Sequence, residues 1–250
     1  MNASPAPILA MRSVSKSFGG LRVLEEVTLA IAAGERRAII GPNGAGKTTL
    51  FHIMSGLLAP SAGSIELYGS DITRFAVHQR AALGMARTFQ LTTLFPNLTV
   101  LENVLLALHG LSRSKFALLK PMSGYRALIE RAGELLEQWR LAEHANRLVR
   151  ELAYGEQRAL EILLAVCQQP KLLLLDEPTA GLSPAETTVA VEIIQSLPRQ
   201  LSIVLIEHDM DVAFRLCEAV TVLHAGKVVA SGTAESVRRD PDVKAIYLGD

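Results

Sequence analysis

The sequence has no excess of either charge. Its 250 residues carry 25 Lys plus Arg against 25 Asp plus Glu. This balance removes the broad electrostatic attraction on which non-specific nucleic-acid binders depend, although a local basic patch remains compatible with it. We therefore expect no nucleic-acid partner.

Long apolar runs are also missing. Hydrophobic residues make up 49% of the chain, yet no stretch approaches the roughly 20 uninterrupted apolar residues that a membrane-spanning helix needs. The segment Met1–Met11 has no basic region and too short an apolar run for a secretory signal. We therefore expect a cytoplasmic protein that is soluble when isolated.

Cysteine is scarce. Cys167 and Cys217 lie in apolar helical contexts without the spacing of a metal site, so we expect two small core residues. No motif recurs in the chain. A length of 250 residues is near the upper limit for one hydrophobic core, which favours a single domain over residues 1–250.

Short apolar runs are what the sequence does contain. Residues 8–31 alternate apolar and polar positions around Gly19-Gly20, which predicts a β-hairpin, and Ser64–Tyr68 predicts a later strand. Other short runs are separated by helical patterns, as in a parallel sheet covered on both faces. These runs are Arg36–Ile40, Leu172–Leu175, Ser202–Ile206 and Val220–Leu223.

Between Gln90 and Leu152 the strand-like runs disappear. Helical patterns such as Tyr125–Leu141 take their place, which predicts an inserted helical subdomain over approximately residues 91–160. Within it, Ser112–Gly124 lacks clear periodicity and contains a proline, so we expect a surface excursion there.

A glycine-rich loop joins the strand predicted at Arg36–Ile40 to a helical pattern over Lys47–Leu57. It matches GxxxxGK[ST] in full, in the strand-loop-helix context that this motif requires. Its backbone N–H groups can turn toward phosphate oxygens, and the helix N-terminus favours the same anion. We expect Lys47 to reach the β- and γ-phosphates of ATP and Thr48 to ligate Mg²⁺. The predicted contacts are Gly41, Pro42, Asn43, Gly44, Ala45, Gly46, Lys47, Thr48 and Thr49.

Two carboxylates, Asp176 and Glu177, follow the apolar run Leu172–Leu175. Open α/β sheets bind their ligands at the carboxyl ends of strands. We expect Asp176 to hold Mg²⁺ directly or through water, and Glu177 to orient or deprotonate the attacking water. Together with the glycine loop, this pair indicates ATP hydrolysis.

The chain resembles the nucleotide-binding subunit of ATP-binding cassette transporters over essentially its whole length. Leu152–Gln157, at the start of a helix, is similar to the family's signature loop. His208 matches the switch histidine, and Gln90 matches the glutamine that joins the two lobes. Phe18 falls where the family stacks an aromatic ring on adenine, and Ala180–Ser183 falls at the D-loop.

The resemblance implies an α/β fold: a P-loop NTPase (RecA-like) core with an N-terminal antiparallel β-subdomain and an inserted α-helical subdomain. It also implies a head-to-tail dimer, in which the signature loop of one subunit caps the ATP bound to the other. The residues expected to be catalytic are Glu177, His208 and Gln90, and those expected to hold the metal are Thr48, Gln90 and Asp176. The nucleotide contacts would be completed by Phe18 and by Ala153, Tyr154, Gly155 and Glu156.

The signature loop departs from the common family pattern, LSGGQ. Ala153 and Tyr154 remove the serine hydroxyl that contacts the γ-phosphate, whereas Gly155 keeps close backbone approach possible. Glu156 is expected to face away from phosphate, toward Arg158 or a capping position. Tyr154 has two open roles, a contact at the dimer interface or packing on its own helix.

Three further segments resemble the branched-chain amino acid importers: the Ala-Tyr-Gly signature, Arg87–Gln90 and the tail Asp242–Gly249. Ser183 stands where the D-loop usually has an aspartate. This subfamily implies partners of three kinds, namely membrane permease subunits, a second ATP-binding subunit and, indirectly, a solute-binding protein. It also implies a peripheral position on the cytoplasmic face of the membrane.

Two alternatives are weaker. A soluble cassette ATPase acting on nucleic acid or ribosomes would normally have two cassettes in tandem or a very long coiled-coil insertion, and the sequence has neither. A P-loop kinase or switch GTPase would not explain residues 152–157 or His208.

Overall fold

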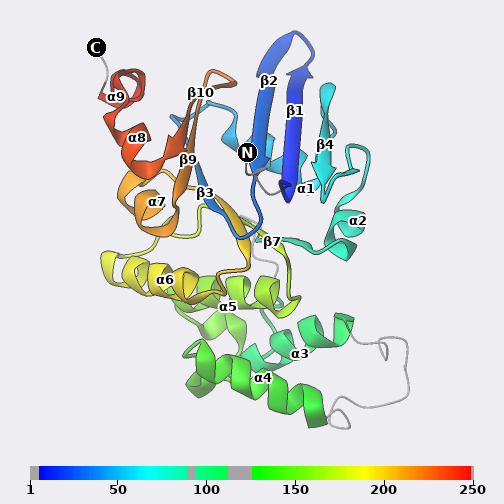
Figure 1. The fold of residues 1–250 in the computed structure, drawn as a ribbon. Coiled ribbons are helices and arrows are strands. Elements are labelled where there is room, and N and C mark those ends of the chain that lie inside the picture. The colour runs from blue at the N-terminus through cyan, green and yellow to red at the C-terminus, as the bar shows by residue number, and fades with distance from the viewer. Residues whose placement is uncertain (1–5, 89–93, 112–125, 249–250) are drawn as a thin grey trace. The chain divides into compact units, whose positions relative to one another are not determined.

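The computed structural model describes residues 6–88, 94–111 and 126–248. The chain divides into two compact units, which are described separately. The first unit spans Met1–Arg87, Lys171–Pro178 and Ile194–Asp250. The second spans Thr88–Pro170 and Thr179–Ile193. The colours of Figure 1 follow the chain through both units.

An antiparallel four-stranded sheet of order β2-β1-β4-β5 belongs to the first unit (Figure 1). Its strands are β1 (Leu9–Phe18), β2 (Leu21–Ile31), β4 (Ala62–Leu67) and β5 (Ser70–Asp71). β1 and β2 form the predicted hairpin, with Leu9 opposite Ile31 and Phe18 opposite Leu21. Gly19 takes a φ of 57° in the connecting turn, a conformation that glycine adopts without steric cost.

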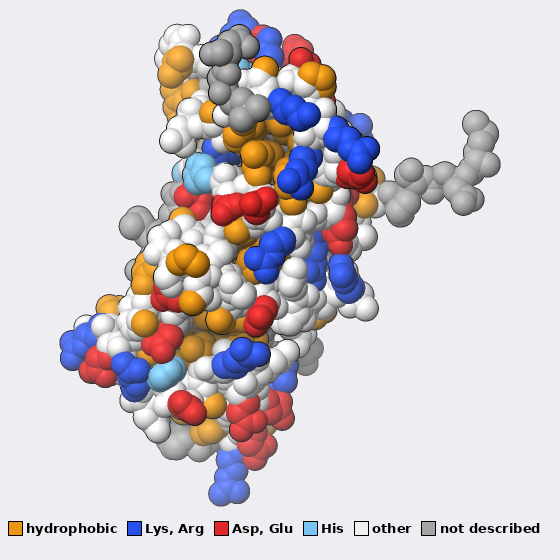
Figure 2. Space-filling view, turned by 90° about the vertical axis from the view of Figure 1, so that its left-hand side faces the viewer, with side chains coloured by type: hydrophobic (Ala, Val, Ile, Leu, Met, Phe, Trp, Pro, Cys, Tyr) orange, Lys and Arg blue, Asp and Glu red, His pale blue; other side chains and the backbone are white. Residues whose placement is uncertain are grey.

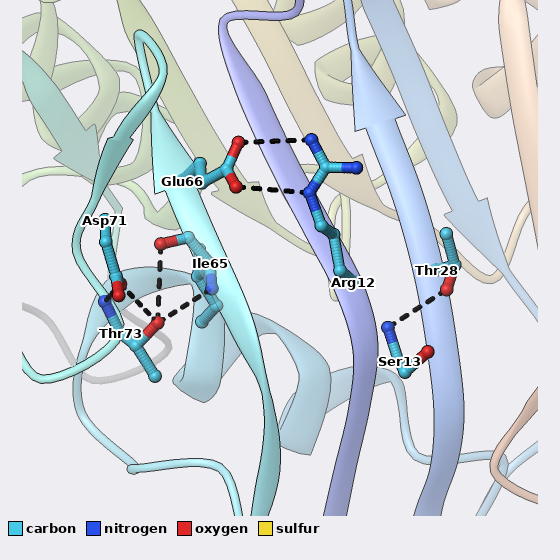
Figure 3. Close-up of polar contacts among 7 residues, drawn as sticks. All are labelled: Arg12, Ser13, Thr28, Ile65, Glu66, Asp71 and Thr73. Carbon is cyan, nitrogen blue, oxygen red and sulfur yellow. Dashed lines mark hydrogen bonds and ion pairs between the residues drawn. The ribbon is translucent and has the colours of Figure 1, made fainter.

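Polar side chains tie the strands of this sheet together on its exposed surface (Figure 3). The Arg12 guanidinium on β1 donates to both carboxylate oxygens of Glu66 on β4, at 3.1 and 3.3 Å. The Thr73 hydroxyl accepts the backbone N–H of Ile65 at 2.9 Å. The first contact joins β1 to β4, and the second joins β4 to the residues that follow β5.

A six-stranded sheet of order β10-β9-β3-β8-β7-β6 also belongs to the first unit. Strands β6, β7, β8, β3 and β9 are parallel, whereas β10 pairs with β9 in the antiparallel sense. Every residue of β7 and β8 is buried, as is typical of central parallel strands. The strands are β3 (Arg36–Ile40), β6 (Met85–Arg87), β7 (Leu172–Asp176), β8 (Ser202–Ile206), β9 (Ala219–His224) and β10 (Lys227–Thr233).

The apolar core of the first unit joins both sheets to helix α1 (Lys47–Ser55). Leu50, Phe51, Ile53 and Met54 are fully buried on this helix. The other helices of the unit are α2 (Val77–Ala82), α7 (Met210–Leu216), α8 (Ala234–Arg239) and α9 (Pro241–Leu248). The core therefore holds the start of α1, and with it the glycine loop, in a fixed position.

The second unit is mainly helical. Its helices are α3 (Val100–Leu111), α4 (Arg126–Gln138), α5 (Tyr154–Cys167) and most of α6 (Pro184–Ser196), with 3₁₀ turns at Ala142–His144 and Val149–Glu151. An isolated bridge joins Thr99 to Leu148. The described ranges contain no helix with the length and apolar character needed to cross a membrane.

The predicted strands lie within two residues of the observed ones, whereas β5, β6 and β10 were not predicted. Two ends differ for identifiable local reasons. The helix predicted over Lys47–Leu57 ends at Ser55 because Gly56 takes a left-handed φ of 82°. The strand predicted at Ser64–Tyr68 ends at Leu67, and Tyr68 has a positive φ of 51°. Both cysteines are buried and free, as expected. The predicted excursion at 112–124 lies outside the described residues.

Candidate nucleotide-binding and hydrolysis site

The glycine loop turns sharply between β3 and α1 because three of its positions cannot carry a side chain easily. A Cβ atom on Gly41 would lie 2.0 Å from the carbonyl oxygen of Leu223. One on Gly46 would lie 2.8 Å from a methyl carbon of Leu24. Gly44 instead faces open space and is glycine for its φ of 79°. The loop is thus packed on one side and open on the other, as a phosphate cradle requires.

Lys47 is folded over this loop. Its Nζ atom donates to the carbonyl oxygens of Gly41 at 2.6 Å and Pro42 at 3.0 Å. Burial lowers the pKa of Lys47, and the nearby Glu177 carboxylate opposes that shift. The ammonium group is therefore held above the cradle, where an anion would neutralise a partly desolvated charge.

Glu177 lies directly after β7, in a left-handed backbone conformation with a φ of 47°. Its Oε1 atom is 2.5 Å from Nε2 of His208, which follows β8. Since β7 and β8 are adjacent and parallel, their carboxyl ends bring these two predicted catalytic residues together. This pairing can orient a water molecule or hold a proton.

Asp176 is the last residue of β7, and its side chain is fully buried. Its Oδ2 atom accepts from the guanidinium of Arg87 at 2.8 Å. The same guanidinium donates to the Ser55 hydroxyl at 2.8 Å and lies 5.7 Å from the ring centroid of Phe51. Arg87 thus links the predicted metal ligand to helix α1.

The donor set suits Mg²⁺. Thr48 offers a hydroxyl oxygen and Asp176 a carboxylate, both hard ligands of the kind that this ion prefers. Among the described residues no group of three or more His, Cys, Asp or Glu side chains could hold a metal. A site with few protein ligands is typical for Mg²⁺ that is also bound by substrate phosphates.

The residues of the predicted signature loop start helix α5 in the second unit. Ala153 is the N-cap, and the Glu156 carboxylate accepts its backbone N–H at 2.8 Å. The other oxygen of Glu156 lies 2.9 Å from Nε2 of His144. Glu156 therefore takes the expected capping position and contacts His144, whereas Arg158 pairs with Glu161 at 2.7 Å.

Tyr154 is 53% exposed, and its ring lies against the D-loop of the same chain. A Cβ atom on Gly181 would be 3.3 Å from Cε1 of this ring. The side chain therefore reaches beyond its own helix to the D-loop, which neither of the two roles considered from the sequence included. An interface role for its exposed face stays a prediction.

Of two other predicted site residues, the structure describes Phe18 but not Gln90. Phe18 is 47% exposed, and Nζ of Lys16 lies 5.0 Å from its ring centroid, so the ring is accessible for stacking. Gln90, expected both to act in catalysis and to ligate the metal, lies outside the described residues.

Two residues that contact predicted site residues, Arg87 and Tyr247, had no site role predicted from the sequence. In the sequence, Arg87 was only part of a segment that resembles one subfamily. Its position at the carboxyl end of a short strand could have indicated a place in the site. Tyr247 of α9 accepts the backbone N–H of Gly41, a contact that opposes the burial raising the pKa of Tyr247 to about 12. No local pattern indicates that contact.

Comparisons with known proteins agree with this geometry. The family model described as "ABC transporter" matches residues 24–180. A second model, "Branched-chain amino acid ATP-binding cassette transporter", matches residues 227–250.

Curated relatives include the high-affinity branched-chain amino acid transport ATP-binding proteins LivG of Salmonella typhimurium, 41% identical, and BraF of Pseudomonas aeruginosa, 39% identical. In both comparisons the alignment covers 98% of each chain. The lipopolysaccharide export system ATP-binding protein LptB of Haemophilus influenzae is 34% identical over 97% of this chain and 98% of its own.

Solved structures of similar fold include the ADP conformation of an ATP-binding cassette of an ABC transporter. It has a TM-score of 0.83 and 28% identity, over 98% of this chain and 99% of that one. A dimeric post-hydrolysis cassette bound to ADP and Pi has a TM-score of 0.74 and 27% identity, over 90% of this chain and 98% of that one.

The glycine loop, the two carboxylates at the end of β7 and the histidine after β8 define a P-loop nucleotide hydrolase. Within that class, the chain belongs to the ABC transporter family. It is an ATP-binding ATPase of that family, as the sequence predicted.

Proposed function

We propose that this chain is the ATPase subunit of an importer for branched-chain amino acids. The assignment of the substrate class is supported by the match of residues 227–250 to the family model for branched-chain amino acid cassettes. The chain also aligns over nearly its whole length with LivG and BraF, whereas the match to LptB is weaker. The relevant partners are membrane permease subunits and a second ATP-binding subunit, with a solute-binding protein acting indirectly, and the subunit lies on the cytoplasmic face of the membrane.

The chemistry is hydrolysis of ATP, with Mg²⁺ neutralising charge on the phosphates. Lys47 leaves the carbonyl oxygens of Gly41 and Pro42 and donates to phosphate oxygens, because an anion is a better partner for an ammonium group than a neutral carbonyl. Thr48 and Asp176 hold the metal, and Gln90 is a further ligand in this proposal.

Glu177 orients the attacking water and accepts its proton, and His208 holds the Glu177 carboxylate in place. The 2.5 Å contact between Oε1 of Glu177 and Nε2 of His208 is the observation that supports this division of roles. Phe18 stacks on the adenine ring. Since Ala153–Glu156 start a helix, their amides can complete the phosphate contacts in a dimer.

Two variants test the chemistry. Glu177→Gln keeps the shape of the side chain and removes its basicity, so ATP binding should persist while kcat falls by several hundredfold, which corresponds to about 3–4 kcal/mol of barrier. Lys47→Ala should instead weaken ATP binding itself. Full turnover by Glu177→Gln, measured by phosphate release, would remove Glu177 from its role.

The substrate class requires the whole assembly. A strain that lacks the gene for this chain should lose uptake of radiolabelled leucine, isoleucine and valine and regain it with the wild-type gene, but not with Glu177→Gln. Normal uptake of all three amino acids without the gene would reject the substrate assignment. It would leave the ATPase assignment untouched, because that depends on the purified protein.

A further inference from the structure

Glu186, in the first turn of α6, makes contacts on two sides. Its Oε2 atom accepts the backbone N–H of Ser183 at 2.9 Å and the Ser183 hydroxyl at 2.6 Å, which caps the start of the helix. These two bonds, with a smaller contribution from the N–H of Gly155, lower the pKa of Glu186. The carboxylate is therefore charged at neutral pH while it faces the first turn of α5.

The side chain of Glu186 lies close to position 155 of α5. A Cβ atom there would lie 2.8 Å from Oε1 of Glu186 and 3.1 Å from both its Cδ and Cγ atoms. Such a distance requires one of the two groups to move. A larger residue at this position would therefore require the Glu186 side chain to shift.

Tyr154 and Gly181 form a second contact between the same two loops. The ring of Tyr154 lies beside Gly181 and leaves little space for a side chain there, since a Cβ atom on that glycine would be 3.3 Å from Cε1 of the ring. Within the second unit, the signature loop and the D-loop are thus linked by an apolar contact and by a carboxylate. A change at Glu186 is expected to affect both loops.

The first backbone N–H groups of α5 have no carbonyl partner within the helix, and a helix N-terminus favours an anion. Glu156 satisfies the N–H of Ala153, and Glu186 faces the N–H of Gly155. In the proposed function, the γ-phosphate of ATP bound to a second copy or a related subunit needs the Gly155 amide. A carboxylate and a phosphate repel each other at short range and cannot share one donor at full strength.

We propose that Glu186 is a positioning residue that holds the Gly155 amide in the ATP-free subunit and yields it to the γ-phosphate as the dimer closes. It thereby raises the ATP concentration that closure requires. This inference rests on the proposed function, because it needs ATP-dependent dimerisation.

The test measures dimerisation of the full-length chain against ATP concentration in the Glu177→Gln background, by light scattering or sedimentation. Glu186→Gln keeps an oxygen for the Ser183 cap but removes the charge, so half-maximal dimerisation should need about two- to fivefold less ATP, the range expected for one charge at a helix N-terminus. Glu192→Gln is the matched control, because it removes a carboxylate from the same helix without a contact to Gly155. It should leave the ATP requirement unchanged.

The sign of the shift separates this proposal from a purely structural role. Ser183→Ala weakens the cap and leaves the charge in place, so it should raise the ATP requirement or leave it unchanged. An equal or higher ATP requirement for Glu186→Gln, or equal shifts for Glu186→Gln and Glu192→Gln, would overturn the proposal.

Hydrogen exchange at Gly155 provides a second measurement that needs no dimer. In the nucleotide-free protein, Glu186→Ala should speed exchange of this amide several-fold relative to wild type, while Glu192→Ala should not. Unchanged exchange in Glu186→Ala would reject the contact itself. If Glu177→Gln failed to dimerise at any ATP concentration while the exchange result held, the proposed function would be at fault and the competition with phosphate would fall with it.

Discussion

The guanidinium of Arg87 donates to the carboxylate of Asp176 at 2.8 Å. Both side chains are buried, with 5% of Arg87 and 0% of Asp176 exposed. Arg87 ends β6 and pairs in register with Leu174 of the adjacent parallel strand β7, two residues before Asp176. A second bond to the Ser55 hydroxyl fixes the guanidinium plane. The proposed metal ligand is therefore held by a neighbouring strand and by helix α1.

Arg87→Gln should destabilise the protein by about 3–5 kcal/mol, because it leaves a buried carboxylate without its cation. Arg87→Lys should lose less, since it keeps the charge but cannot reach both Ser55 and Asp176 with a planar fork. Denaturant unfolding followed by circular dichroism gives these free energies. Arg131→Gln breaks an exposed pair with Glu134 and should cost at most about 1 kcal/mol. Equal losses for Arg87→Gln and Arg131→Gln would contradict the role of burial.

Arg80 should be as sensitive to substitution. Its side chain is 1% exposed, and burial lowers its pKa only to about 10, so it stays charged at neutral pH. Its N–H groups donate to the backbone carbonyls of Phe75, Ile53, Met54, Ile72 and Thr73. Two of these carbonyls, those of Ile53 and Met54, lie in the last turn of α1. The Ile53 carbonyl also accepts the backbone N–H of Gly56 at 3.2 Å.

The carbonyls of Ile53 and Ile72 would keep the backbone N–H groups of Gly56 and Phe75 in Arg80→Lys. The lysine has fewer donors and no planar fork, so other buried carbonyls would lose their partner, at a cost of about 1–3 kcal/mol each. We expect a loss of at least about 3 kcal/mol in unfolding free energy, measured by urea titration. The exposed Arg74 nearby supplies the control, since Arg74→Lys should change stability by less than about 0.5 kcal/mol. A loss for Arg80→Lys within that same range would mean that water satisfies the carbonyls.

His52 predicts a dependence of stability on pH. Burial first, and then the charge of Arg87, lower the pKa of this histidine, while Asp176 opposes the shift. The unfolded chain therefore binds a proton more readily than the folded one between pH 6.5 and the lower folded pKa. Stability should be present above pH 6.5 and decline as the pH falls through this window.

The decline from His52 should stay well below the roughly 1.4 kcal/mol per pH unit of one full proton, because the imidazole is partly exposed and its charge is screened. His52→Gln should flatten the slope of unfolding free energy between pH 7 and pH 5.5. His78→Gln, at an exposed position on α2, should leave it unchanged. An identical slope in wild type and His52→Gln would assign the effect to other groups.

The elements that sequence reasoning predicted well are those encoded by neighbouring residues. The glycines of the loop Gly41–Thr48 determine its conformation. The bounds of β3 and β8 were predicted to the residue because both strands are bounded by polar segments. Helix ends were less accurate, since the left-handed turn at Gly56 depends on one backbone angle. Local patterns therefore predicted most strands, but not β5, β6 and β10.

Contacts between segments that are distant in the sequence could not be predicted from local patterns. Arg87 and Asp176 are 89 positions apart, and nothing in either segment names the other as its partner. The contact of Glu186 with the start of α5 could not be predicted for the same reason. A glutamate near the start of a helix predicts only a local cap. Long side chains have many rotamers, so their pairings are set by strand order and helix packing and not by periodicity.

Tyr247 allows a last test of how a distant element affects the glycine loop. Its hydroxyl on α9 accepts the backbone N–H of Gly41, and this helix lies in the segment that matches the branched-chain amino acid model. Tyr247→Phe removes the hydroxyl and keeps the ring, so the start of the loop loses one restraint. One hydrogen bond contributes about 1 kcal/mol, and ATP affinity should fall by about fivefold. Fluorescent-nucleotide titration measures this change, with Tyr68→Phe as the control because Tyr68 is 41% exposed and belongs to the turn after β4. If both variants bound ATP as tightly as wild type, the hydroxyl would have no part in ordering the loop, and α9 would act only through its apolar packing.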